Sequence, residues 1–147
     1  MSDKRNIPIS QDAAIVLALA DTAVPFAATV EDEAERWLRV MRMHGQVGQV
    51  LQAIGVGEAP LESTAQPRAV RLLRRRSIGE DVVEQVSDRA CELAHQRGAG
   101  VLTTVDVLFA VLEVYGKAFD RSLYVRGAGR EELLYRLGDA VSARSSE

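Results

Sequence analysis

Apolar residues recur at the spacing of an amphipathic helix along most of the chain, and glycine, proline or a capping residue separates one run from the next. No window shows the sustained alternation of apolar and polar residues that is typical of a half-buried strand. The sequence therefore predicts an all-α protein. Helices are expected over residues 10–24, 29–44, 47–54, 68–76, 78–97, 103–115, 118–126 and 130–141.

Residues that favour helix ends lie at the boundaries of these runs. Ser10 is a good N-cap for the first helix, and Gly98 and Gly116 lie where later helices should end. Apolar residues surround most of the first helix, which predicts that it is largely buried. Three pairs have the spacing of a capping box: Thr29 and Asp32, Ser77 and Glu80, and Thr103 and Asp106.

Two parts of the chain share their apolar positions and their glycine stops. If Gly45 is placed over Gly116, one extra residue in the second copy also places Gly55 over Gly127. The aligned core positions are Ala34 with Val105, Trp37 with Leu108, Leu38 with Phe109, Val40 with Val111, and Met41 with Leu112. Core positions coincide while surface residues differ, which indicates an internal duplication in which each copy buries the same face.

The second copy resembles one repeat of the Clp N-terminal domain, the substrate- and adaptor-binding module of Clp-type AAA+ unfoldases. The resemblance is carried by Ala90, Leu93, Ala94, Gly98, the run LTTVDVLFAVLE at residues 102–113, Gly116, Leu123, Gly127, Leu133 and Leu134. The segment GQVGQVLQAIGV at residues 45–56 resembles the short helix and glycine stop of the same family.

This resemblance implies one all-α domain with a pseudo-twofold axis that relates two four-helix repeats. Its expected parts are an N-terminal arm (1–8), repeat one (9–56), a connection (57–77), repeat two (78–137) and a polar tail (138–147). The family binds partners near the start of the first helix of each repeat. The matching residues here are Ile7, Ile9 and Ser10 in repeat one, and Ile78, Gly79 and Val82 in repeat two.

Charged residues are expected to form a rim around such a site: Glu31, Asp32, Glu35, Arg74, Arg75, Arg76 and Asp106. The acidic run at residues 31–35 has two interpretations, a rim for basic peptides or a first helical turn matched to the helix dipole. Trp37, the only tryptophan, occupies a core position of the repeat, which favours a core role over a binding role.

One departure from the family concerns phosphoarginine. Members that bind it carry Thr-Glu-His at the start of the second helix of each repeat. The alignment places Ala34 and Val105 at the Glu positions, and Glu35 and Asp106 at the His positions. A carboxylate one residue away points about 100° round the helix. We therefore do not expect phosphoarginine binding.

The charge distribution bears on the choice of partner. The net charge is −3, but five arginines and no acidic residue lie between residues 63 and 76. These arginines allow contact with phosphates, yet no aromatic residue lies among them for base stacking, and both flanking segments are acidic. Nucleic acid is therefore a less favoured partner than a protein or peptide. Self-assembly, for instance as a homodimer, is the other alternative.

Residues with catalytic chemistry are sparse. Cys91 and His95 lie one helical turn apart, but a thiolate–imidazole pair needs an orienting group and a zinc site needs further ligands. The chain has no GxxxxGK[ST] phosphate loop, no signal-peptide pattern and no apolar run of membrane-spanning length. We expect a cytoplasmic, non-enzymatic binding protein without cofactor or metal. It would be an adaptor, a decoy or a regulator of Clp-dependent unfolding and proteolysis, with a Clp ATPase or its substrates as partners.

Overall fold

The computed structural model of the chain describes residues 7–56 and 82–143. These ranges contain α1 (Gln11–Ala23), the 3-10 helix η2 (Val24–Phe26), α2 (Val30–Arg42), α3 (Gly45–Ala53), α5 (Val82–Gln96), α6 (Thr104–Tyr115), α7 (Lys117–Val125) and α8 (Arg130–Ala143). The described part has no strand, only one parallel bridge between Ile9 and Leu102. The all-α prediction is confirmed. The helix predicted over 68–76 and the pair Ser77 and Glu80 lie outside the described residues.

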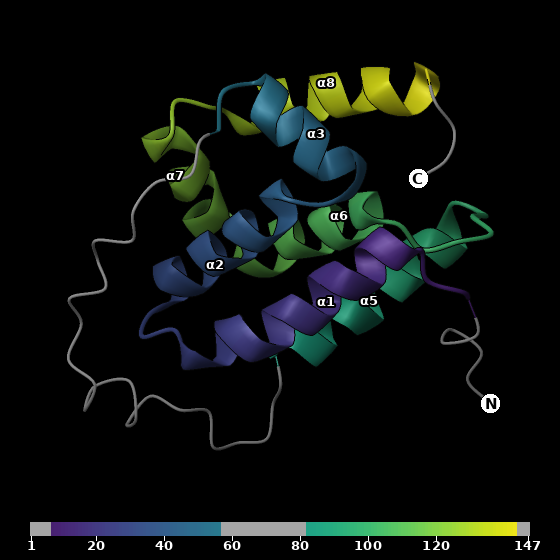
Figure 1. The fold of residues 1–147 in the computed structure, drawn as a ribbon, viewed down its shortest axis with the longest axis horizontal. Helices are drawn as coiled ribbons and strands as arrows, with labels where there is room; N and C mark the ends of the chain where they lie inside the picture. Colours follow the sequence, from purple (N-terminus) through teal and green to yellow (C-terminus); the bar gives the residue numbers. More distant parts are fainter. Residues whose placement is uncertain (1–6, 57–81, 144–147) are drawn as a thin grey trace.

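The helices are stacked in three tiers (Figure 1). The helices α1 and α5 lie side by side in one outer tier, and α3 and α8 form the opposite one. Between them lie α2 and α6, which contact each other and helices of both outer tiers. The helix α7 packs against α2 at one end of the stack. Both halves of the sequence therefore contribute to every tier.

One core of buried residues joins the two halves. Trp37 of α2 and Phe119 of α7 are its largest fully buried side chains. The core role predicted for Trp37 is confirmed.

The prediction that the first helix is largely buried is wrong. Only Ala13, Val16 and Ala20 of α1 are buried, and Leu19 is 42% exposed. The helix lies in an outer tier, so one face packs on its neighbours and the other faces water (Figure 1). Alanines account for much of its apolar circumference, and alanine favours a helix whether or not it is buried.

Two of the predicted caps form as expected. The Ser10 hydroxyl accepts a hydrogen bond from the Ala13 amide at 3.1 Å. Thr103 and Asp106 make a full capping box. At the start of α2 the pattern differs: Thr29 Oγ1 accepts from the Asp32 amide, but the Asp32 carboxylate accepts from Ala28 instead of from Thr29. The second hydrogen bond of the capping box is thus donated by Ala28, the residue before the N-cap.

Candidate functional site

The expected partner-binding residues do not gather at one place. Ile9 is exposed at the start of α1, next to the half-buried Ile7, and Val82 is the first residue of α5. Figure 1 shows that α1 and α5 begin at opposite ends of their tier. Ile9 and Val82 therefore belong to separate surfaces, as two neighbourhoods in two repeats require. Ile78 and Gly79 lie outside the described residues.

The segment before α1 is held by backbone hydrogen bonds. The Ser10 amide donates to the Leu102 carbonyl, and the Leu102 amide donates to the Pro8 carbonyl, both at 2.9 Å. Ser10 uses its side chain as the helix cap. The role of this residue in the structure is therefore to position the start of α1.

The predicted charged rim is only partly brought together. Glu31, Asp32 and Glu35 line a cleft of about 280 Å³ between α2 and α7, with Thr29, Arg121, Ser122 and Val125. The prediction that Asp106 belongs to the rim is wrong, because its side chain is 0% exposed and takes part in the capping box. Arg74, Arg75 and Arg76 lie outside the described residues.

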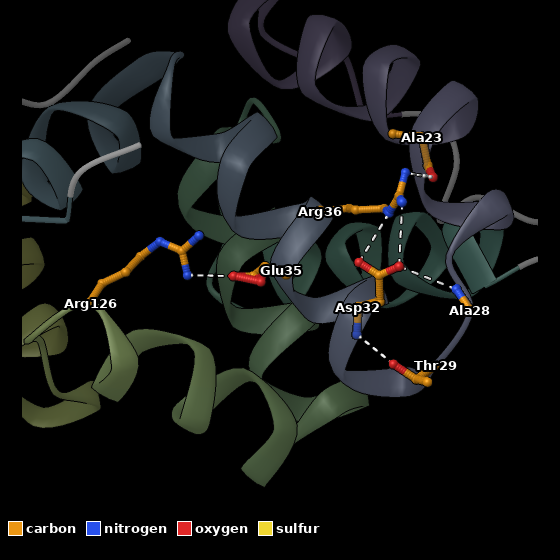
Figure 2. A network of polar contacts seen from close by, with 7 residues as sticks. All are labelled: Ala23, Ala28, Thr29, Asp32, Glu35, Arg36 and Arg126. Carbon is orange, nitrogen blue, oxygen red and sulfur yellow. Dashed lines mark hydrogen bonds and ion pairs between the residues drawn. The ribbon is translucent and has the colours of Figure 1, made fainter. Parts of the chain in front are cut away.

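Each carboxylate of the α2/α7 cleft already has a cationic partner in this chain. Glu31 pairs with Arg121 at 2.7 Å, and Glu35 pairs with Arg126 at 2.7 Å. The Arg126 side chain is only 4% exposed, and its Nη2 atom is buried without a hydrogen-bond partner. Figure 2 shows Arg126 reaching Glu35 from the α7 side. The cleft therefore offers little uncompensated negative charge to a basic peptide.

Asp32 has a structural role at the corner between α1 and α2 (Figure 2). Its carboxylate accepts from the Ala28 amide at 3.2 Å and from Arg36 Nε at 3.3 Å. Arg36 Nη1 in turn donates to the Ala23 carbonyl at 3.4 Å, at the end of α1. These contacts fix the angle at which the chain enters α2.

The Glu31–Arg121 pair leads to a testable prediction about the pKa of Glu31. The hydrogen bond from Arg121 lowers the pKa of the Glu31 carboxyl from its ordinary value. A carboxyl whose pKa is lower in the folded state stabilises the fold above its unfolded pKa, and this contribution disappears as pH falls through the folded pKa. We expect Arg121→Gln to raise the pKa of Glu31, measured by NMR titration of its side-chain carboxyl. An unchanged pKa would show that the pair does not form in solution.

A second hollow, which we call the α6/α8 groove, is mainly apolar. It encloses about 340 Å³ and is lined by Arg97, Thr103, Val105, Phe109, Leu134, Leu137 and Gly138. Phe109 and Leu134 are half-buried, so their apolar surface is in part accessible. A Cβ atom built on Gly138 would meet no other atom within 4 Å. The groove is therefore open at the position where α8 passes it.

One end of the groove holds a structured ion pair. Arg97 Nε donates to Asp106 Oδ1 at 2.8 Å, and Arg97 Nη2 donates to Oδ2 at 2.6 Å. Asp106 Oδ2 also accepts from the Thr103 amide at 3.0 Å. The hydrogen bond with Asp106 raises the pKa of Arg97 above its already high ordinary value. The guanidinium thus stays charged and is held in one orientation, although its side chain is 46% exposed.

We expect the Asp106 carboxylate to stabilise the fold. We expect Asp106→Ala to lower the free energy of unfolding by about 1–2 kcal/mol, because the Thr103 amide loses its acceptor and Arg97 loses its carboxylate partner. Asp106→Asn should cost less, because an amide oxygen still accepts from the Thr103 amide. Urea unfolding followed by circular dichroism tests both variants. Equal losses would mean that the charge, and not the cap, determines the effect.

A buried polar chain that the sequence did not indicate connects α2 with α6. Trp37 Nε1 donates to the Tyr115 hydroxyl at 3.1 Å, and that hydroxyl donates to Glu33 Oε1 at 2.8 Å. Glu33 is buried although it lies in an acidic first turn that resembles a solvated one. Glu33 lies four residues before Trp37, so the two share a face of the helix. This spacing from a predicted core residue could have indicated that Glu33 is buried.

The remaining questions for the described residues are a cysteine–histidine pair, a metal site and a membrane-spanning helix. Cys91 is buried and His95 is exposed, although they are one turn apart on α5. No group of three or more potential metal ligands occurs among residues 7–56 and 82–143. Within the same ranges, no helix has both the length and the apolar character that crossing a membrane requires.

Comparison with protein-family models, curated proteins and solved structures found no match to this chain. The relation to the Clp N-terminal domain is a proposal that rests on the residues that carry the resemblance.

Proposed function

We propose that this chain is a Clp-N-like module that binds a peptide or protein segment in the α6/α8 groove and performs no chemistry. The observation that carries the proposal is the groove itself, an open apolar hollow with a few polar groups at one end. Sites for ligands commonly combine an apolar lining with a small number of fixed polar groups. Val105, which replaces the carboxylate expected in phosphoarginine-binding relatives, contributes to its apolar lining.

The packing of the helices supports a duplicated, single-domain fold. The helix α2 packs on α7, and the corresponding helix of the other proposed repeat, α6, packs on α3. Contacts of this reciprocal kind are what a pseudo-twofold axis between two repeats would produce. They also explain why α2 and α6 meet in the central tier (Figure 1).

The ends of α3 and α7 support the same proposal in detail. The Val56 amide donates to the Leu51 carbonyl at 2.9 Å, and the Ala128 amide donates to the Leu123 carbonyl at 3.0 Å. Each turn passes through a glycine with positive φ, 96° at Gly55 and 81° at Gly127. These residues are aligned in the proposed repeat, and glycine adopts this conformation without the strain a Cβ would cause.

The binding proposal is tested by closing the groove. A randomised peptide library displayed on phage is selected against the wild-type chain, and enriched peptides are then measured with Gly138→Met. We expect the methionine side chain to occupy the groove and reduce binding at least tenfold, without disturbing the core. Gly129→Met is the matched control, because a Cβ at Gly129 also meets no atom and this residue does not line the groove.

Two results would contradict the proposal. One is that selection on the wild-type chain enriches no peptide. The other is that both methionine variants bind the enriched peptides as tightly as the wild type does. If Gly138→Met still binds the enriched peptides and Ile9→Ser does not, the site lies instead at the start of α1.

The proposed cellular role is that of an adaptor, a decoy or a regulator of a Clp machine. These roles predict different effects on the degradation of an unfolded substrate by a Clp ATPase with its protease. An adaptor accelerates degradation, whereas a decoy that occupies substrates slows it. An unchanged rate, together with no binding to either the ATPase or the substrate, would exclude all three roles.

Self-assembly is a second candidate function that one observation favours. Tyr124 and Val125 are consecutive residues of α7, and they are 80% and 76% exposed. Adjacent exposed apolar side chains are suited to an interface between copies of the chain. Analytical ultracentrifugation of the wild type and of Tyr124→Ser/Val125→Ser tests this candidate. A monomer at all concentrations would exclude it.

A further inference from the structure

We propose that the α6/α8 groove selects a peptide segment in which an aliphatic side chain lies next to an acidic one, and that Arg97 contacts the acidic side chain. This inference rests on the proposed peptide-binding function and specifies its ligand. Arg97 would be the residue that determines specificity, while Val105, Phe109 and Leu134 would bind the aliphatic side chain.

The size and lining of the groove define the apolar part of the ligand. Its volume of about 340 Å³ is near the lower end of the range of about 300–1,000 Å³ for small-molecule sites. Such a space accommodates one or two side chains and not a whole helix. Four of the seven described residues that line it are apolar with large side chains: Val105, Phe109, Leu134 and Leu137. Burial of an aliphatic side chain against them is favourable because it removes apolar surface from water.

The charge at the end of the groove defines the polar part. Among the described residues that line the groove, Arg97 is the only charged one. Its Nε and Nη2 atoms bind Asp106, and the described residues provide no hydrogen bond to its Nη1 atom. A partially exposed guanidinium with an available donor favours an acceptor, and it repels a lysine or arginine of the ligand.

Asp106 does not cancel this preference. Its carboxylate is shared between Arg97 and the Thr103 amide. It also lies in the first turn of α6, where the partial positive charge of the helix N-terminus compensates a negative charge. Positive charge on Arg97 thus remains for a second carboxylate. Because the guanidinium is already held by two bonds, it loses little conformational entropy on binding a ligand.

The test uses three acetylated and amidated peptides with a common Leu-Leu pair, followed by Glu, Gln or Lys. Blocked ends leave this one side chain as the only variable charge. Binding is followed by NMR through the backbone amides of Val105, Phe109 and Leu134, a method that detects weak association. We expect the Glu peptide to bind about three- to tenfold more tightly than the Gln peptide, the range for a partly exposed charged contact. The Lys peptide should bind most weakly.

A variant without the groove charge shows whether Arg97 causes the preference. Arg97→Gln/Asp106→Asn removes both charges together, and the Asn oxygen retains the cap on the Thr103 amide. We expect this variant to bind the three peptides with nearly equal affinity. If it does not fold, titration of the wild type at increasing salt gives the same information, because screening should reduce the difference between Glu and Gln.

The outcomes separate this inference from the proposed function. Equal binding of all three peptides, abolished by Gly138→Met, would overturn the acidic preference and leave the peptide-binding function intact. A preference for Lys would overturn the inference in the same way. Absence of shifts at the groove amides with every peptide would count against both proposals.

Discussion

Tyr115→Phe is expected to lower the free energy of unfolding by about 2–4 kcal/mol, although it removes a single oxygen atom. The hydroxyl accepts from Trp37 Nε1 and donates to Glu33 Oε1, and all three side chains are buried. Its loss leaves a buried indole N–H without this acceptor and a buried carboxylate without this donor. Leaving a buried donor such as this indole N–H unsatisfied costs about 1–3 kcal/mol, and the loss of one hydrogen bond at the Glu33 carboxyl adds to it.

Tyr124→Phe provides the matched control for this prediction. It makes the same chemical change at a tyrosine of α7 that is 80% exposed. We expect it to alter stability by less than about 0.5 kcal/mol, as is usual for surface substitutions. Urea unfolding followed by circular dichroism compares the two variants with the wild type. Equal stability of both variants would show that the Glu33–Tyr115–Trp37 chain does not stabilise the fold.

The sequence predicted helix ends better than it predicted burial. The N-caps Ser10 and Thr103 and the glycine stops at Gly98 and Gly116 depend on local chemistry within a few residues, which a single sequence displays. Both ends of α1 and α6, and the last residue of α5, are accordingly close to the predicted ones. The altered cap at Thr29 is a smaller departure, because it depends on the chain direction before α2 and not on residue spacing.

Burial depends instead on partners that are distant in the sequence. Glu33 and Asp106 both lie in first turns, where acidic residues are typical of a solvated surface. Glu33 is buried beside Tyr115, which lies on a different helix and donates a hydrogen bond to it. Asp106 is buried because Arg97 and its own cap satisfy it. Neither Tyr115 nor Arg97 can be identified as a partner from local periodicity. The sequence therefore predicted an exposed rim, although Glu33 and Asp106 are buried.

The candidate site was only partly visible in the sequence for the same reason. Val105 was noted because it occupies the position of a family carboxylate. The residues that complete the α6/α8 groove, Leu134 and Gly138, come from the last helix and have no local signal for a site. Their proximity to α6 results from tertiary packing alone.

The contact between α2 and α3 gives a prediction whose sign is opposite to that of helix propensity. Gly48 lies inside α3, where alanine would normally be favoured over glycine by about 1 kcal/mol. A Cβ built on Gly48 would lie 2.8 Å from the Arg42 carbonyl oxygen and 2.9 Å from that of Met41. Both are backbone atoms at the end of α2, so neither can move without shifting that helix.

We therefore expect Gly48→Ala to lower the free energy of unfolding by about 2–3 kcal/mol, the cost of overpacking a tight contact. Gly138→Ala is the matched control, since it is the same substitution within α8 at a position where a Cβ meets no atom. Propensity alone predicts that this control gains up to about 1 kcal/mol. Urea unfolding of both variants measures the difference, and a stabilising effect of Gly48→Ala would mean that α2 and α3 do not approach as closely as the structure shows.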